Sequence, residues 1–322
     1  MSEFQPFSSC GDAVGVPDDD LRGPDADALA RRKSLFQETS RERIERITLG
    51  TAWSVLPKRI DRLPRLARLV MQDLLTADAA LPDPARTPDV PELVGIAHDL
   101  SAPTLLEAYR RGLFPHGHFG PTKWLSPPER CVLFIEDFHM PKRLKRLMRQ
   151  DRYTVTFDRD FEGVIKACAG KREGRWHVTW ITPRIMRAYA ALYDTGHVHS
   201  FEVWNSEGAL VGGGYGVAIG RVFFTESQFS HADNTSKLGF AVLNWHLAQW
   251  GYALNDGKWL TPTILDMGFR VIPRREFLRI LAETTGEGGR SGRWCVEAGP
   301  KAVADWNPNE SAAAYQAVEV ME

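Results

Sequence analysis

The pattern of hydrophobic and polar positions changes twice along the N-terminal third of the chain. Residues 1–40 are rich in Asp, Pro and Ser with little apolar periodicity, so we predict that they are mostly disordered. Over residues 63–74, leucines recur at helical spacing between arginines, which predicts a basic amphipathic helix. Such a helix usually packs on the protein body with its charges in water, and contact with a membrane or RNA is the alternative.

Denser periodicity begins near Leu93 and predicts an α+β fold. Runs at 199–204, 209–219 and 222–227 are joined by short turns and predict an antiparallel meander. A long helix over 236–250 follows. We therefore expect a central mixed sheet flanked by helices. The further expected elements are strands at 131–135, 153–157 and 252–256, and helices at 104–112, 141–149, 160–168, 183–195, 262–267 and 276–282.

Several common catalytic motifs are absent from the sequence. There is no nucleophile elbow, phosphate-binding P-loop or zinc-protease HExxH motif. The glycine-dense run Gly212–Gly220 does not open a helix, so we expect a strand that lets another group approach closely. The segment HADNTSKLGFAV at the start of the long helix lacks the spacing of an acyl-CoA pyrophosphate turn, which disfavours an acyl-CoA donor.

Charge and hydropathy narrow the possible partners. The formal net charge is −1, so a polyanion would need a local basic patch. The helix expected at 142–152 offers one, with six cations in eleven positions, although a solvated helix face is the plain alternative. The sequence contains no run of about 18 apolar residues, so we predict no membrane-spanning helix. The N-terminus lacks a secretory pattern, so we expect a cytoplasmic protein.

Four side chains near predicted strand ends and loops are candidates for site chemistry. Trp124 and Trp180 lie outside apolar runs, where indoles can stack on bases, although many tryptophans are simply core residues. Glu226 and Asp256 lie near the ends of predicted strands. A carboxylate there can cap a helix, or it can orient an amine and take its proton.

Several colinear segments resemble the leucyl/phenylalanyl-tRNA–protein transferase family. They cover about residues 93–283, and the first 90 residues and the tail lie outside the resemblance. The segments are AYRRGLFP (108–115), KWLSPPER with CVLF (123–134), TVTFDRDFEGVIKACA (154–169), TWITPRIMRAY (179–189), GHVHSFEVW (196–204), LVGGGYGVAIGRVFFTESQFS (210–230), NTSK (234–237) and PRREFL (273–278).

The resemblance implies a fold, a reaction and its partners. It implies an acetyltransferase-like (GNAT-type) mixed sheet with flanking helices. The expected division is an N-terminal extension (1–90), a small N-terminal domain (91–150), a catalytic domain (151–284) and a flexible tail (285–322). The implied donor is an aminoacyl-tRNA and the acceptor is the α-amine of a protein, usually one beginning with Arg or Lys. The product is marked for degradation, and no metal or other cofactor is used. The resemblance does not imply a particular oligomeric state.

The resemblance also assigns roles to individual side chains. Glu226, Asp256 and Lys258 are the expected catalytic positions. The expected substrate-binding residues are Trp124, Trp180, Gly214, Phe224, Gln228, Phe240, Leu243 and Asn255. The expected tRNA-binding residues are Lys142, Arg143, Lys145, Arg146 and Arg149.

The sequence departs from the family pattern at the expected active site. Where the family usually reads I-D-C-Q, this chain has Asn255, Asp256, Gly257 and Lys258. A charged Lys258 would repel an incoming N-terminal Arg or Lys, and pairing with Asp256 would keep it charged.

Other departures affect the expected donor pocket. Gly214, Gln228 and Asn255 replace bulky apolar residues, and His116 replaces the tryptophan of an F-P-W motif. A pocket with two amides should prefer a ligand that hydrogen-bonds to them over leucine. The sequence therefore does not decide which amino acid is transferred. An acyltransferase acting on another amine and a non-catalytic protein that binds tRNA or N-termini are the alternative functions.

Overall fold

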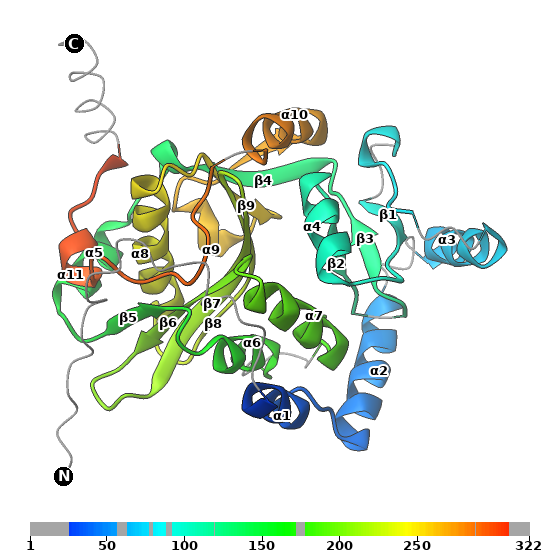
Figure 1. The fold of residues 1–322 in the computed structure, drawn as a ribbon, viewed down its shortest axis with the longest axis horizontal. Coiled ribbons are helices and arrows are strands. Elements are labelled where there is room, and N and C mark those ends of the chain that lie inside the picture. Colours follow the sequence, from blue (N-terminus) through cyan, green and yellow to red (C-terminus); the bar gives the residue numbers. More distant parts are fainter. Residues whose placement is uncertain are drawn as a thin grey trace.

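The structure is a computed structural model that describes residues 26–56, 63–76, 80–87, 92–118, 120–171, 178–286 and 288–308. A large and a small sheet organise it (Figure 1). The strands are β1 (Leu93–Ile96), β2 (Phe114–His116), β3 (Lys123–Leu125), β4 (Glu129–Phe134), β5 (Thr154–Phe157), β6 (Val198–Trp204), β7 (Leu210–Ile219), β8 (Val222–Ser230), β9 (Leu254–Lys258) and β10 (Arg270–Pro273).

The large sheet has seven strands in the order β10-β4-β9-β8-β7-β6-β5. Its neighbours pair antiparallel except β8 and β9, which are parallel. The predicted meander is β6–β8, and the predicted α+β fold with a mixed sheet is confirmed. The small sheet has the order β1-β3-β2. Because β4 lies in the large sheet, part of the segment expected as the small domain, residues 129–134, belongs to the main body.

Helices cover both faces of the large sheet (Figure 1). Helices α5, α8 and α11 lie on one face, and α6 and α7 lie on the other, next to α4. Among the described residues the helices are α1 (Ala26–Leu35), α2 (Ser40–Ser54), α3 (Leu63–Thr76), α4 (Ala102–Arg110), α5 (Lys142–Arg149), α6 (Phe161–Ala169), α7 (Pro183–Asp194), α8 (Thr235–Gln249), α9 (Pro262–Leu265), α10 (Arg274–Thr284) and α11 (Pro300–Val303), with 3-10 turns at Pro84–Arg86 and Ile135–Asp137.

The glycine-dense run forms most of β7, as predicted, and allows close packing. A Cβ at Gly212 would lie 2.4 Å from Oγ1 of Thr235, the first residue of α8. A Cβ at Gly216 would lie 2.5 Å from the Phe223 ring. The bare backbone therefore lets the start of α8 and a β8 ring approach the sheet. This packing holds α8 and β8 against β7, and β8 carries Glu226.

The N-terminal extension is more ordered than its composition predicts. Helix α1 is docked by Arg32, which donates to Glu162 over 2.7 Å and makes a bidentate pair with Asp194. Phe36 follows it and is 1% exposed. The prediction of disorder is therefore wrong for residues 26–40, because these few side chains dock the segment. Residues 1–25 lie outside the described part.

Helix α3 is the predicted amphipathic helix. Leu66 and Leu69 pack against the core, whereas Met71, Leu74 and Leu75 face solvent. The favoured packing on the protein body is thus confirmed for the first half of the helix. Among the described residues, no helix is long and apolar enough to cross a bilayer.

The segment after α10 also packs on the sheet. Trp294 is 1% exposed, and its ring stacks on His199 with centroids 3.6 Å apart. Its backbone N–H donates to the Asp158 carboxylate over 2.8 Å. The prediction of a flexible tail over 285–322 is therefore wrong for residues 288–308, because one buried indole and its backbone hydrogen bond anchor a sequence with little periodicity.

Candidate active site

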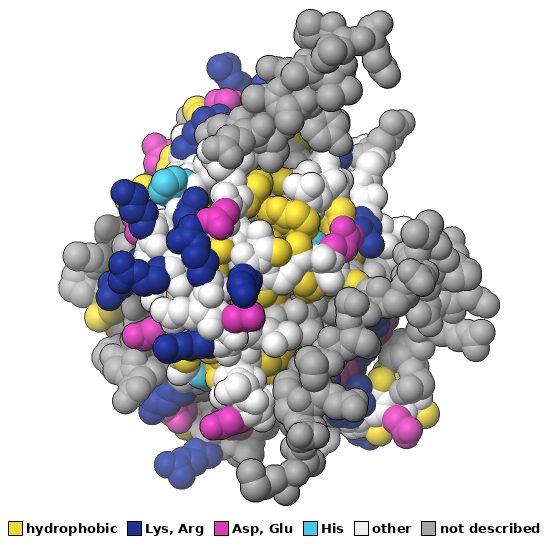
Figure 2. All heavy atoms as spheres, turned by 90° about the vertical axis from the view of Figure 1, so that its left-hand side faces the viewer, with side chains coloured by type: hydrophobic (Ala, Val, Ile, Leu, Met, Phe, Trp, Pro, Cys, Tyr) yellow, Lys and Arg dark blue, Asp and Glu magenta, His cyan; other side chains and the backbone are white. Residues whose placement is uncertain are grey.

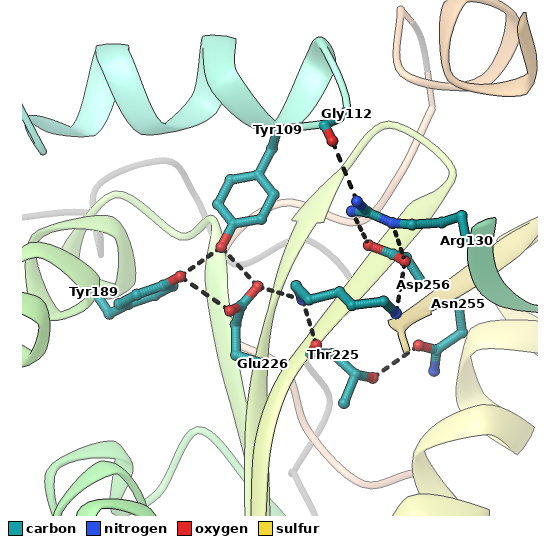
Figure 3. Close-up of polar contacts among 9 residues, drawn as sticks. Tyr109, Gly112, Arg130, Tyr189, Thr225, Glu226, Asn255 and Asp256 are labelled. Carbon is teal, nitrogen blue, oxygen red and sulfur yellow. Dashed lines mark hydrogen bonds and ion pairs between the residues drawn. The ribbon is translucent and has the colours of Figure 1, made fainter. Parts of the chain in front are cut away.

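Glu226 of β8 is the centre of a buried polar cluster (Figure 3). Its side chain is 1% exposed. Tyr109 of α4 donates to Oε1 over 2.6 Å, Tyr189 of α7 donates to Oε2 over 3.0 Å, and the two hydroxyl oxygens are 2.5 Å apart. Burial, and then the negative charge of Glu226, raise the pKa of both tyrosines well above their usual value. Both hydroxyls therefore remain protonated. Because each carries a single proton, two of these three short contacts are hydrogen bonds at any one time.

Lys258 completes this cluster from the end of β9. Its Nζ donates to Oε1 of Glu226 over 2.7 Å and to the carbonyl oxygen of Thr225. Its backbone is left-handed at φ +64°, and its N–H donates to Asp256 over 2.9 Å. The sequence suggested that the Lys258 ammonium pairs with Asp256. The structure pairs it with Glu226 instead, so Lys258 meets Asp256 only through its backbone.

Asp256 is held by a different cation. Arg130 of β4 makes a bidentate pair with it at 2.7 and 2.8 Å, and the two side chains are 1% and 0% exposed. The same guanidinium donates to the Gly112 carbonyl over 3.3 Å and lies 4.7 Å from the centre of the Phe114 ring. Both predicted carboxylates are therefore already ion-paired, and Asp256 has no exposed surface.

Sequence reasoning missed three partners in this site: Tyr109, Arg130 and Tyr189. All three lie inside the segments that carry the family resemblance, at 108–115, 123–134 and 179–189. Arg130 is 126 residues from Asp256, and Tyr109 is 117 residues from Glu226. Only the folded structure shows which carboxylate each of them contacts.

Asn255 is buried but already hydrogen-bonded. Its side-chain oxygen accepts from Thr225 over 2.7 Å, and its amide nitrogen donates to Asn244 over 3.0 Å. Asn244 in turn donates to the Phe240 carbonyl over 2.7 Å. Both the oxygen and the nitrogen of the Asn255 side chain therefore have hydrogen-bond partners inside the protein. This weakens the argument that Asn255 selects a polar donor side chain.

Gly214 does not leave an empty space in the expected donor pocket. It pairs with Gln228 across β7 and β8. A Cβ at this position would lie 2.7 Å from Cγ of Gln228 and 2.8 Å from the Phe201 ring. These two side chains therefore occupy the volume that a larger residue would fill.

The apolar residues expected in one pocket lie in two cores. Phe240 and Leu243 of α8 belong to the core on the α8 face, together with Phe223. Phe224 belongs to the other core, where its ring lies 5.1 Å from that of Tyr109. Phe223 is therefore the β8 residue that accompanies Phe240 and Leu243, and Phe224 packs against Tyr109.

An aromatic wall adjoins the Glu226 cluster; it is formed by His116, Trp180 and Trp259. His116 stacks on Trp180 with centroids 5.3 Å apart and meets Trp259 edge-on at 5.2 Å. Trp180 in turn meets Tyr189 at 6.2 Å. Trp124 of β3, by contrast, is 3% exposed and belongs to the core, so its ring has little surface for stacking on a base.

Helix α5 presents the predicted basic face. Leu144 and Met148 are buried, Lys142, Arg143 and Arg146 are exposed, and Lys145 is half-buried. Arg149 pairs with Asp305 of the C-terminal segment. Figure 2 looks onto this side of the molecule, where Lys and Arg side chains gather on part of the surface with acidic side chains among them. Within the described residues, no group of three or more His, Cys, Asp and Glu could hold a metal ion.

Comparison with known proteins identifies the family. The sequence profile of the leucyl/phenylalanyl-tRNA protein transferases matches residues 132–282, and the profile of their N-terminal domain matches 98–128. A leucyl/phenylalanyl-tRNA–protein transferase of Azotobacter vinelandii is 50% identical over 186 residues, which are 58% of this chain and 81% of that protein. Those of Pseudomonas syringae pv. syringae and Nitrosospira multiformis are 48% and 40% identical, over 59% and 64% of this chain and 82% and 88% of their own lengths. The chain belongs to the leucyl/phenylalanyl-tRNA–protein transferase family.

Proposed function

We propose that this protein transfers leucine or phenylalanine from an aminoacyl-tRNA to the N-terminal α-amine of a protein, marking that protein for degradation. The observation that carries the proposal is the Glu226 cluster in a chain of this family: a buried carboxylate at the end of a polar network, beside an aromatic wall. An aminoacyl ester is already activated, so the reaction needs no covalent nucleophile on the enzyme.

In this reaction, the amine nitrogen attacks the ester carbonyl, the bond from that carbon to the ribose oxygen breaks, and the amine proton ends on the ribose oxygen. A carboxylate has about four acceptor positions, and Tyr109, Tyr189 and Lys258 use at most three at Glu226. We propose that the remaining one orients the amine that reacts. Asp256 lies beneath the site and acts as a positioning residue through Arg130 and the Lys258 backbone.

The donor and its tRNA have their own proposed sites. Trp180 and the aromatic wall hold the 3′ end of the tRNA by stacking. The basic face of α5 contacts phosphates of the acceptor stem. The catalytic domain consists of residues 151–284 together with β4 and is of the GNAT type: the order of meander, α8 and a parallel β9 supports this assignment. The reaction would take place in the cytoplasm.

A direct transfer assay tests this proposal. Purified protein is incubated with tRNA charged with labelled leucine or phenylalanine and with peptides whose first residue varies. Matched peptides with an acetylated N-terminus are the control. We expect label at the α-amine of free peptides and none in the acetylated ones. Binding of charged tRNA without transfer to any peptide would instead favour the non-catalytic binding protein.

A further inference from the structure

The aromatic wall continues into the N-terminal extension. Trp53 lies near the end of α2, and its ring meets that of His118 with centroids 4.7 Å apart. His118 in turn meets His116 of the wall at 4.8 Å. A continuous series of ring contacts therefore connects Trp53 to Trp180, which lies next to the Glu226 cluster.

The rings of this series are partly exposed, and they form a surface suited to nucleic-acid bases. The side chains concerned are Trp53, His116, His118 and Trp180. Unpaired bases stack on such rings in single-stranded nucleic acids. The wall lacks one indole because His116 replaces the tryptophan of the F-P-W motif, and an imidazole offers a smaller stacking surface. Trp53 brings an indole back to this surface, two ring contacts away from His116.

Helix α2 holds Trp53 in place. The helix begins with a reciprocal cap: the N–H of Glu42 donates to the Thr39 side chain over 3.2 Å, and the N–H of Thr39 donates to the Glu42 side chain over 2.8 Å. Phe36, just before this cap, is 1% exposed, and its carbonyl accepts from Arg187 of α7 over 3.2 Å. The other end of α2, which carries Trp53, lies beside the small sheet (Figure 1). Because both ends of α2 contact the body, the Trp53 ring is positioned before a ligand binds.

The place of Trp53 fits a particular part of the donor. The 3′ end of a tRNA is the unpaired sequence C-C-A, and the amino acid is esterified to the ribose of the terminal adenosine. In the proposed reaction this ester lies at Glu226, so the terminal adenosine is near Trp180 and the cytidines before it are farther from the reacting carbon. Trp53 lies three ring contacts beyond Trp180 on the side away from the Glu226 cluster.

We propose that Trp53 of the N-terminal extension belongs to the donor-binding site, where its indole stacks on a cytidine that precedes the terminal adenosine of the tRNA. This inference rests on the proposed transfer reaction and adds a donor-binding residue to it. The family profiles match this chain only from residue 98 onward, so α2 lies outside the part that they describe. The extension thus increases affinity for the donor and takes no part in the chemical step.

The test compares two donors that differ in the bases they carry. Leucyl-tRNA contains the cytidines, whereas leucyl-adenosine contains only the terminal nucleoside. Leucyl-adenosine is measured as a donor and as a competitive inhibitor, so that its affinity is obtained even if it reacts slowly. Because Trp53→Ala removes a stacking surface, KM for leucyl-tRNA should rise by about tenfold while the affinity for leucyl-adenosine is unchanged. Trp53→Phe keeps a ring and should retain most of the wild-type affinity for leucyl-tRNA.

Further variants separate stacking from a purely structural role. Trp53→Leu keeps an apolar side chain against His118 but has no aromatic face, so KM for leucyl-tRNA should rise as in Trp53→Ala. Ile47→Ala is the matched control, since Ile47 is on the same helix and is 49% exposed. It should change neither donor.

Three results overturn the inference: equal losses with both donors, unchanged use of leucyl-tRNA by Trp53→Ala, and a rise in KM for the acceptor peptide alone. The first would mean that Trp53 only attaches α2 to the body, and the last would assign Trp53 to the acceptor. A wild-type protein that transfers leucine from neither donor would instead overturn the proposed function itself.

Discussion

Lys258 donates from Nζ to Oε1 of Glu226 over 2.7 Å, and the two side chains are 4% and 1% exposed. The backbone of Lys258 is left-handed, and its side chain contacts Glu226 although Asp256 is closer in sequence. The pair neutralises the Glu226 side chain from one side, and the hydroxyls of Tyr109 and Tyr189 contact it from the other. This arrangement makes Glu226 the residue on which the proposed chemistry depends.

The tyrosine donors should matter for rate more than for binding. Tyr109→Phe and Tyr189→Phe each remove a hydroxyl that contacts Glu226. Because a hydrogen bond to a charged group contributes about 1.5–3 kcal/mol, we expect kcat to fall by about tenfold or more in each variant. Tyr193→Phe is the control, since its hydroxyl donates to the Asp158 carbonyl instead. Steady-state kinetics with one good acceptor peptide would show the difference, and equal effects in all three variants would contradict it.

The Arg130–Asp256 pair should contribute mainly to stability. Arg130→Met leaves a fully buried carboxylate without its partner, which typically costs about 3–5 kcal/mol in the free energy of unfolding. The double variant Arg130→Met with Asp256→Asn removes both charges and should recover part of that loss. Urea unfolding followed by tryptophan fluorescence measures both values. A single variant as stable as the wild type would show that the pair does not hold β4 against β9.

Helix α5 should control tRNA affinity. Arg143→Glu with Arg146→Glu reverses two exposed cations, so the dissociation constant for tRNA should rise by about tenfold or more, and the salt dependence of binding should become less steep. Arg149→Gln is the matched control because Asp305 already pairs with this cation. Filter binding at several salt concentrations separates the two cases. Unchanged affinity in the double variant would place the tRNA elsewhere.

Glu202 should make stability depend on pH. Burial raises the pKa of its carboxyl from 4.5 to about 7, although Ser200 and Thr156 donate to it. The folded protein therefore binds this proton more tightly than the unfolded chain. The stability that results is fully present below about pH 4.5 and is lost as the pH rises through about 7. Thermal unfolding measured from about pH 4.5 to about pH 7 should show a smaller decrease in Tm for Glu202→Gln than for the wild type. Parallel curves of Tm against pH for the two proteins would contradict the assignment.

Arg32 should hold the extension on the body. Its guanidinium bridges Glu162 and Asp194 and is 10% exposed. Arg32→Gln breaks this bridge, so the amides of α1 should lose protection from hydrogen exchange while the strands of the large sheet keep theirs. Arg31→Gln is the control, since Arg31 is 56% exposed and binds Glu162 from the surface. Loss of protection throughout the protein would mean that the extension is part of the global folding unit.

Local pattern predicted much of the fold because alternation and helical spacing act over a few residues. The meander β6–β8 and helix α8 are within a few residues of their expected bounds. The family resemblance pointed to Glu226 and Asp256. Their partners could not be predicted, because Tyr109 and Arg130 are more than 100 residues away in sequence. The same limitation explains α1, where a few long-range contacts order a segment with a disordered composition.

The expected polar donor pocket shows a second limit. The identities of Gln228 and Asn255 suggested two free amides, but hydrogen bonding depends on neighbours that the sequence does not reveal. Asn255 is bound to Thr225 and Asn244. Gln228 lies over Gly214. The structure thus removes much of the physical reason to expect a polar donor, and leucine or phenylalanine becomes the simpler expectation.

The most direct test of the account is single-turnover transfer from leucyl-tRNA to a peptide α-amine by the wild type and by Glu226→Gln, with tRNA affinity measured on the same preparations. If Glu226 orients the amine, the transfer rate should fall by about 100-fold or more while tRNA binding is unchanged. A Glu226→Gln protein that transfers leucine at the wild-type rate would show that the reaction does not depend on this cluster and would contradict the central claim.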